Sequence, residues 1–414
     1  MRVLWTVNVL PPHIAKQLGE KSGHAISWVE AMSAGLAKRK DIVLAIAAGG
    51  HSQDVQKAEF DGITYYLYNK HIGMEKSWKQ IIADFKPDII HAYGTEGTHN
   101  MPLIREFKEK TPIVISLQGI IEQYKRRYLG GLNTYEILRN YTLKDVLFRN
   151  GIFAGRAAFY RQAKREAWMF RNVRYVEGRS DWDRAMSAEI NPELMYFYCP
   201  RMIRSAFFNY RWNGEKCEKH SIFVHQGNYP IKGMHFMLDA LRILRRKYPD
   251  VKLYVSGSNI LKKQGVKSAF SQNGYAKLIS RRIKALNLED CVVFTGYLNA
   301  DQLAQKLTEM EVCVVPSVIE NAPNALAEAM IVGVPCVAGD VGGNADMLDY
   351  GKSGLLYCHD EPEMLAARVA SLFESDELKK QVAESAYQTA RNRHNPRELP
   401  ERLIGIYEQI IEDF

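Results

Sequence analysis

The chain has 414 residues, of which 46% are hydrophobic and 25% are charged, as is ordinary for a globular protein. This length predicts two domains of roughly 200 residues each. No run of about 18 uninterrupted apolar residues occurs, so we expect no membrane-spanning helix. Proline soon interrupts the apolar N-terminus, which therefore predicts a first strand rather than a signal peptide.

The cysteines are scattered along the chain, and most lie in or beside apolar runs. They are Cys199, Cys217, Cys291, Cys313, Cys336 and Cys358. This pattern indicates small buried thiols in a reducing compartment rather than a disulfide framework or a zinc site. We therefore expect a cytoplasmic protein.

The first part of the chain alternates between apolar runs and helical periodicities. We expect strands at 2–9, 41–47, 62–68, 89–91 and 113–117, and helices at 26–38, 76–85 and 101–110. A strict alternation of this kind predicts a parallel sheet that helices cover on both faces.

Between residues 120 and 175 the alternation lapses, and aromatic residues interleave with positive charge. This region holds 12 Lys or Arg against 4 Asp or Glu, and its surplus of +8 equals the net charge of the whole chain. Such a pattern is compatible with an anionic membrane surface, with nucleic acid, and with an acceptor-binding or merely solvated face.

The pattern resumes with strands at 175–177 and 195–198 and a helix that Ser180 caps. Asp181 and Asp183 resemble a metal-binding D-x-D motif, but acidic residues also suit the first turn of a helix, and we favour that structural interpretation. Residues 202–219 are irregular and polar and predict a linker. After it we expect strands at 221–225, 251–255, 291–295, 312–316 and 336–338, with helices between them and two helices over 361–374 and 376–391.

The stretch from Cys313 to Met347 organises the second half. A strand, a helix and a second strand form a βαβ unit, whose ligand edge is the loop after the first strand. With Ala322 as N-cap and Pro323 in the first helical position, the amides of Asn324 and Ala325 remain available to bind an anion. Alternatively, Asn321 caps the helix and the glutamates of this stretch are surface charges.

The run S-x-x-E-N-A-P-N-A-L-A-E-A-M-x-x-G-V-P-C-V-A-x-x-x-G-G, which begins at Ser317, closely resembles the signature of the retaining GT-B glycosyltransferases of family 4, also called group 1. The resemblance implies that Glu320 contacts the donor sugar or its phosphate. It also implies that Glu328 binds the ribose hydroxyls and that Gly342 and Gly343 lie near the sugar.

The fold that this resemblance implies is α/β of the GT-B kind, in which two Rossmann-like, doubly wound parallel-sheet domains face each other across a cleft. We expect an acceptor-binding domain at 1–203, a nucleotide-sugar-binding domain at 204–394, and a C-terminal helix at 395–414 that crosses back onto the N-terminal domain. The wide apolar stripe of that last helix requires a partner surface.

Lys232 lies in a turn at a helix N-terminus, where a diphosphate would meet backbone amides and an ammonium group. Gly227 to Gly233 resembles the G-x(5)-K-G phosphate loop of the family, except that four residues rather than five precede Lys232 and Asn228 replaces the usual arginine. Gly257 and Tyr297 follow two other strands of this domain, and we expect them to bind the donor too. Gly23 loosely matches the glycine loop that approaches the donor phosphate from the N-terminal domain.

On the acceptor side, Gln118 lies where many family members present a histidine. A glutamine cannot transfer a proton, although it can hold a sugar hydroxyl, and His91 could take over the histidine's role. We expect no metal and no cofactor, because Lys232 and the helix amides would neutralise the leaving diphosphate.

These features predict a retaining glycosyltransferase that moves a sugar from a nucleoside-diphosphate sugar to a surface polysaccharide or glycolipid. The partners are then the nucleotide-sugar donor, a glycan or lipid-linked acceptor and, through residues 120–175, an anionic membrane at its inner face, but no nucleic acid. A nucleotide-sugar 2-epimerase and a non-catalytic, nucleotide-sugar-binding subunit of an assembly complex remain as alternatives.

Overall fold

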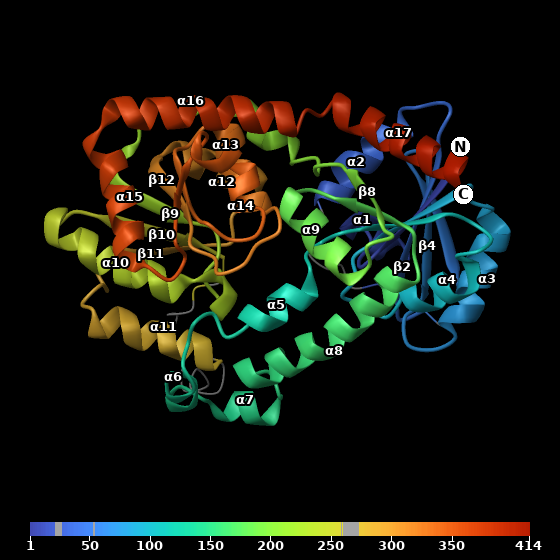
Figure 1. Cartoon of the computed structure of the whole chain (residues 1–414), viewed down its shortest axis with the longest axis horizontal. Coiled ribbons are helices and arrows are strands. Elements are labelled where there is room, and N and C mark those ends of the chain that lie inside the picture. The colour runs from blue at the N-terminus through green and yellow to red at the C-terminus, as the bar shows by residue number, and fades with distance from the viewer. Residues whose placement is uncertain (21–26, 53, 258, 260–272) are drawn as a thin grey trace. The chain divides into compact units, whose positions relative to one another are not determined.

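The computed structural model describes residues 1–20, 27–52, 54–257, 259 and 273–414. The chain divides into two compact units. Unit 1 comprises Met1–Glu122, Arg161–Arg204 and His394–Phe414, and unit 2 comprises Gln123–Tyr160 and Ser205–Arg393. Each unit contains one Rossmann-like α/β sheet, which confirms the fold class expected from the sequence (Figure 1). No helix among the described residues is both long enough and apolar enough to cross a bilayer.

Unit 1 is built on an eight-stranded sheet in the order β3-β4-β2-β1-β5-β6-β7-β8. Its strands are β1 (Arg2–Val7), β2 (Val43–Gly50), β3 (Gln56–Phe60), β4 (Ile63–Asn69), β5 (Ile89–Tyr93), β6 (Ile113–Ser116), β7 (Tyr175–Gly178) and β8 (Met195–Tyr198). All neighbouring strands run parallel except β3, which pairs antiparallel with β4 at the edge. The sequence did not predict β3, because its side chains are mostly exposed and polar.

The helices of unit 1 cover both faces of this sheet (Figure 1). They are α1 (Pro12–Gln17), α2 (Ser27–Ala37), α3 (Met74–Phe85), α4 (Asn100–Phe107), α9 (Asp181–Ile190), α17 (Glu398–Asp413) and the second half of α8 (Ile152–Arg171). Ser180 and Asp183 form the capping box of α9, and the Asp183 side chain is fully buried. The acidic pair at 181 and 183 therefore begins a helix, as the structural interpretation of the motif required.

Unit 2 contains a six-stranded parallel sheet in the order β11-β10-β9-β12-β13-β14. The strands are β9 (Glu218–Val224), β10 (Lys252–Ser256), β11 (Val292–Gly296), β12 (Met310–Val315), β13 (Cys336–Gly339) and β14 (Leu355–Tyr357). The helices that flank it are α10 (Met234–Lys247), α11 (Gly274–Ala285), α12 (Ala300–Thr308), α13 (Asn324–Val332), α14 (Asn344–Met347), α15 (Pro362–Glu374) and α16 (Asp376–Arg393).

Two segments differ from the domain boundaries expected from the sequence. Residues 123–160, which we placed in the N-terminal domain, belong to unit 2. They contain most of α5 (Ile121–Arg127), all of α6 (Thr134–Arg139) and α7 (Leu143–Leu147), and the first half of α8. The Nε2 atom of His235 in α10 donates to the carbonyl of Gly130 at 2.7 Å, which ties this segment to the sheet domain of unit 2.

The expected linker at 202–219 is also wrong in part. Phe207 and Trp212 are buried, and the indole of Trp212 donates to the Met310 carbonyl at 2.8 Å. Because these two aromatic residues pack into unit 2, most of the polar segment around them is a fixed part of that unit rather than a free connection.

Candidate functional site

The turn that carries Lys232 connects β9 to α10 and is shaped by Gly233. Residues Pro230–Lys232 form a short 3-10 helix, and Gly233 follows in the left-handed region with φ of 66°. A Cβ atom on Gly233 would stand 1.7 Å from the carbonyl oxygen of Pro316, after β12. Only glycine therefore allows the two loops to approach this closely. The Val318 amide also donates to the Ile231 carbonyl at 2.8 Å.

This approach brings together the two side chains that the sequence motifs singled out. The ammonium of Lys232 forms an ion pair with Oε1 of Glu320, and the hydroxyl of Ser317 donates to the same oxygen at 2.7 Å. Glu320 is only 6% exposed. Burial by itself lowers the pKa of Lys232, but the charges of Glu320 and Tyr229 and the hydrogen bonds to them together outweigh burial and hold that pKa above its ordinary value. The lysine is therefore charged at neutral pH.

Glu320 is fixed from its other side by the glycine pair. Gly342 has a φ of 55°, and the Gly343 amide donates to the Glu320 carbonyl at 3.2 Å. The backbone around Glu320 is thus held by the loop after β13 as well as by the Lys232 turn, which limits how far its carboxylate can move.

Helix α13 starts one residue later than the sequence indicated. Pro323 is the N-cap, where we expected Ala322, and no side chain caps the helix. The consequence expected for the first amides is unchanged, because a proline cap offers no acceptor for the N–H groups of Asn324 and Ala325. Both residues are partly exposed, so an anion can reach this end of the helix.

Glu328 lies in the second turn of α13 and is 5% exposed. The Nε2 atom of His225, which directly follows β9, lies 4.0 Å from one of its carboxylate oxygens. Sequence reasoning missed both His225 and Ser317. Their position at the carboxyl ends of β9 and β12 is the signal that would have found them, because ligands of α/β folds bind at that edge.

Four other predicted donor residues line one small pocket in unit 2. Gly227, Asn228, Gly257 and Tyr297 surround it together with Gln226, Val255, Ser256 and Phe294. Asn228 and Tyr297 are exposed, and the Ser256 hydroxyl donates to the His225 carbonyl at 2.5 Å. The loops after β9, β10 and β11 therefore meet at one edge of the sheet, beside the residue that approaches Glu328.

In unit 1, Gln118 is held by two arginines that sequence reasoning missed. Arg201 donates from Nη2 to the Gln118 side-chain oxygen, and Arg179 donates from Nη2 to its backbone carbonyl at 2.7 Å. Burial, and then the neighbouring charge of Arg179, lower the pKa of Arg201 well below its ordinary value. Arg179 directly follows β7, and Arg201 lies three residues after the end of β8, at the same sheet edge as Gln118.

The acceptor-side role expected for His91 is not supported. His91 is 1% exposed, its ring stacks on Tyr93, and its Nδ1 atom lies 2.6 Å from the hydroxyl of Tyr407. Burial lowers its pKa, so the ring is neutral. His91 therefore connects β5 to the C-terminal helix α17. The other predicted residue of this domain, Gly23, lies outside the described residues.

Unit 1 also has an open pocket of about 730 Å³ beyond the ends of β1 and β2. Its polar side chains include Glu20, His51 and Lys70. The Nδ1 atom of His51 lies 3.1 Å from Glu20, and the His51 amide donates to the same carboxylate. These hydrogen bonds lower the pKa of Glu20, so the pocket presents a carboxylate at neutral pH.

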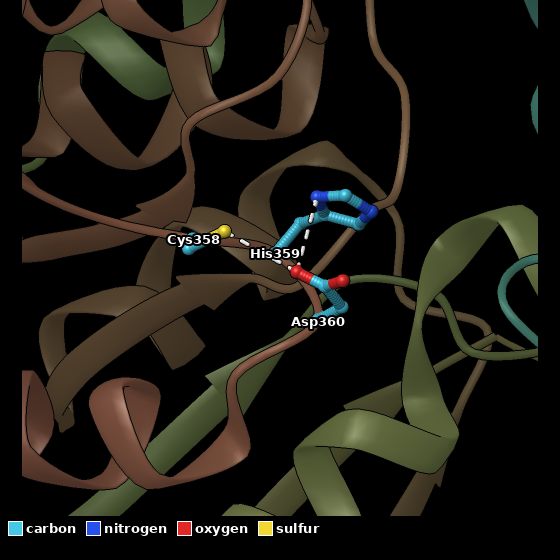
Figure 2. A group of neighbouring side chains, drawn as sticks. All are labelled: Cys358, His359 and Asp360. Carbon is cyan, nitrogen blue, oxygen red and sulfur yellow. Dashed lines mark hydrogen bonds and ion pairs between the residues drawn. The ribbon is translucent and has the colours of Figure 1, made fainter.

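One group of potential metal ligands occurs in the part of the chain that the structure describes, in the turn after β14. Figure 2 shows Cys358, His359 and Asp360, whose ligand atoms all lie within 4.8 Å of one another. The Cys358 thiol donates to Asp360 at 3.2 Å, and this bond raises the pKa of the thiol. A metal ligand must be the thiolate, and structural zinc sites use four ligands, so this trio does not fit a zinc site.

The family match of the chain lies within unit 2. The family model for glycosyl transferases group 1 matches residues 207–389. The uncharacterized glycosyltransferase YqgM of Bacillus subtilis is 27% identical over 184 residues, which is 44% of this chain and 47% of that protein. The amylovoran biosynthesis glycosyltransferase AmsK of Erwinia amylovora is 28% identical over 149 residues, 34% of this chain and 36% of that protein. The chain thus spans about half the length, or less, of these curated relatives.

Among solved structures, HepE of Anabaena, in complex with UDP and glucose, superposes with a TM-score of 0.68. The two chains are 15% identical, and the superposition covers 99% of each. At this identity the likeness establishes the fold alone, which is the GT-B fold of two Rossmann-like domains.

Proposed function

Through residues 207–389 the chain belongs to the glycosyl transferases of group 1, and from this premise we propose that it transfers a sugar from a nucleoside-diphosphate sugar to a hydroxyl acceptor. The observation that carries the proposal is the Lys232–Glu320 ion pair in unit 2. Residues of two separate sequence motifs therefore meet at the carboxyl edge of a parallel sheet, where such folds bind nucleotides.

The proposed chemistry begins with an exchange of partners. When the diphosphate arrives, the ammonium of Lys232 leaves the carboxylate for a phosphate oxygen, and Glu320 is released to accept a hydrogen bond from a sugar hydroxyl. As the glycosidic bond breaks, negative charge grows on the leaving diphosphate. Lys232 and the uncapped amides of Asn324 and Ala325 are donors already positioned to face that charge. They stabilise the transition state more than the ground state, and this difference lowers the activation barrier. Glu328 accepts from the ribose hydroxyls.

We further propose that transfer retains the anomeric configuration by attack on the same face of the sugar, without a metal ion. The acceptor is a glycan or lipid-linked hydroxyl of a surface polysaccharide or glycolipid, which agrees with the amylovoran role in the name of AmsK. Gln118 orients this acceptor. The protein works in the cytoplasm, against the inner face of an anionic membrane through residues 120–175.

Thermal-shift titration with UDP, GDP, ADP and CDP tests donor binding, because a ligand at about 100 times its Kd stabilises the native state by about 2.7 kcal/mol. We expect one diphosphate to raise the melting temperature, and Lys232→Met and Glu328→Gln to abolish that rise. Lys352→Met is the matched control, since the Lys352 side chain is 77% exposed. If no diphosphate stabilises the protein, or if Lys352→Met is as deleterious as Lys232→Met, the proposed donor site is wrong.

The two alternatives predict different products. A 2-epimerase would convert the donor without any acceptor, which NMR of the sugar detects. A non-catalytic subunit would bind the donor but leave it intact with every acceptor, and Glu320→Ala would not impair its assembly complex. A transferase releases the free diphosphate only when an acceptor is present, and the anomeric proton of the product reports whether configuration is retained.

A further inference from the structure

Residues 134–149 of unit 2, here called the α6–α7 segment, expose an unusual amount of apolar surface. Six large hydrophobic side chains within 14 positions are between 58% and 72% exposed: Tyr135, Leu138, Leu143, Val146, Leu147 and Phe148. Soluble proteins rarely leave contiguous apolar patches of this kind uncovered unless they bind something.

Helix α7 buries its acidic side chain and exposes its apolar ones, which is the reverse of what a surface helix of a globular protein usually does. Its acidic residue, Asp145, is 1% exposed, whereas Leu143, Val146 and Leu147 face solvent. Asp145 caps its own helix through Thr142 and accepts from the Gly274 amide at 3.3 Å, at the start of α11. The polar side of the helix is therefore satisfied internally, and the apolar side has no partner among the residues of unit 2 that the structure describes.

The inner face of the segment is fixed to α11 by polar contacts. Arg281 donates to the Arg139 carbonyl and to the side chain of Asn140, both at 3.1 Å. Arg282 lies 3.5 Å from Glu136, while Ile137 is buried in the core of unit 2. Turning the apolar side chains inward would break these contacts, so the outward face is a stable property of the fold.

The charges of the segment select among possible occupants. Its two acidic groups are engaged inward, since Glu136 pairs with Arg282 and Asp145 is buried. The side chains of Arg139 and Arg149 are exposed, and Lys144 adds a third positive charge. The outward face of residues 134–149, all of which the structure describes, thus combines apolar side chains with positive charge only.

We propose that the α6–α7 segment inserts its apolar side chains into the headgroup region of an anionic lipid bilayer. Leucine and phenylalanine partition into the boundary of the acyl chains, tyrosine favours the headgroup level, and arginine binds anionic headgroups. This deepens the membrane contact proposed above by locating it in 16 residues, and it does not depend on the transfer reaction.

Sedimentation of the full chain with lipid vesicles tests this inference. We expect binding to phosphatidylcholine vesicles that contain phosphatidylglycerol and little binding to phosphatidylcholine alone. The triple variant Leu143→Ser, Leu147→Ser, Phe148→Ser should lose about a thousandfold in partition coefficient, since each of the three apolar side chains contributes about tenfold when buried. Arg139→Glu with Arg149→Glu should lose binding mainly at low salt.

The matched control is Ile72→Ser with Met364→Ser, which removes two exposed apolar side chains outside the segment and should leave vesicle binding unchanged. All the substituted side chains are exposed, so the melting temperatures and the diphosphate-induced shift should stay as in the wild type. The inference is overturned if the wild type ignores anionic vesicles or if the triple variant binds them equally well. It is also overturned if the segment instead mediates self-association that the triple variant abolishes.

Discussion

Gly342 lies so close to Glu320 that a Cβ atom on the glycine would stand 1.7 Å from the glutamate carbonyl oxygen. Gly342→Ala must therefore displace the backbone that positions Glu320, and its φ of 55° costs a further 1 to 2 kcal/mol, roughly. We expect the transfer rate to fall by about a hundredfold, the usual effect of a misplacement near 1 Å. Initial rates with the identified donor measure this.

Gly405→Ala is the control for the glycine substitution. A Cβ atom at Gly405, within α17, would meet no heavy atom within 4 Å. The substitution should be silent in activity and should stabilise the helix by about 0.5 to 1 kcal/mol. Equal activity of the two alanine variants would mean that the loop at Gly342 has no part in placing Glu320.

Asn228 occupies an exposed position in the pocket that Gly227, Gly257 and Tyr297 share. Asn228→Arg should bring a second cation to the bound diphosphate and tighten its Kd by roughly fivefold, or about 1 kcal/mol. The gain should shrink as ionic strength rises. Isothermal titration calorimetry measures both effects, and Asn228→Gln, which adds length without charge, should change neither. An unaltered Kd in the arginine variant would place the phosphates elsewhere.

Glu166 makes the stability of unit 1 depend on pH. Its buried carboxylate accepts from the Thr95 hydroxyl at 2.7 Å and from the Ile121 and Glu122 amides at 3.1 Å. Burial nevertheless raises its pKa to about 7 from an ordinary 4.5. The folded state thus holds a proton that the unfolded chain has released, so this stabilisation is complete below pH 4.5 and is lost as pH rises through about 7.

Glu166→Gln should remove that part of the pH dependence, which amounts to at most about 3 kcal/mol in the free energy of unfolding. Urea unfolding at a series of pH values between 4.5 and 8, roughly, measures it. Glu109→Gln is the control, because the Glu109 side chain is 84% exposed. Parallel stability curves for the wild type and Glu166→Gln would contradict the assignment of the proton to Glu166.

Tyr407 supplies a buried hydroxyl that two residues of the sheet share. It accepts from the Trp5 indole at 2.9 Å and lies 2.6 Å from Nδ1 of His91. Tyr407→Phe leaves both groups buried without this partner and should cost about 2 to 4 kcal/mol of stability. Calorimetric melting measures the loss. The Kd for the diphosphate should not change, because the donor residues belong to unit 2.

Ile411→Ala, at a 37% exposed position of the same helix, should lower stability far less. A comparable loss in the two variants would mean that the hydroxyl bonds contribute little and that only the packing of α17 counts.

Sequence patterns predicted the parts of the fold where apolar periodicity is uninterrupted. The bounds of β8, Met195–Tyr198, agree with the expected ones, and those of α15, Pro362–Glu374, differ from the expected helix by one residue. In the candidate site, two separate motif resemblances singled out Lys232 and Glu320, and these residues do meet. The bond from Ser317 to Glu320 was missed, although Ser317 begins the same motif and lies at the carboxyl end of a predicted strand.

Predictions from the sequence were wrong where polar side chains are buried or apolar side chains are exposed. In α7 the acidic Asp145 is inside and three apolar residues are outside, so the periodicity that identifies helices points the wrong way. His91 looked like a site residue because it ends a strand beside Gln118, yet the hydroxyl that holds it comes from Tyr407, more than 300 positions along the chain. Contacts over that separation leave no local pattern.

The assignment of His394–Phe414 to unit 1 has a consequence for the order in which the two units fold during synthesis. The strands of that unit leave the ribosome before most of unit 2, but Leu403, Tyr407 and Ile410, which fill one side of its core, leave after it. Unit 2 has all of its segments by then, so co-translational folding should complete the second domain before the first. Without α17, the sheet of unit 1, although it is made earlier than unit 2, would therefore lack one side of its core.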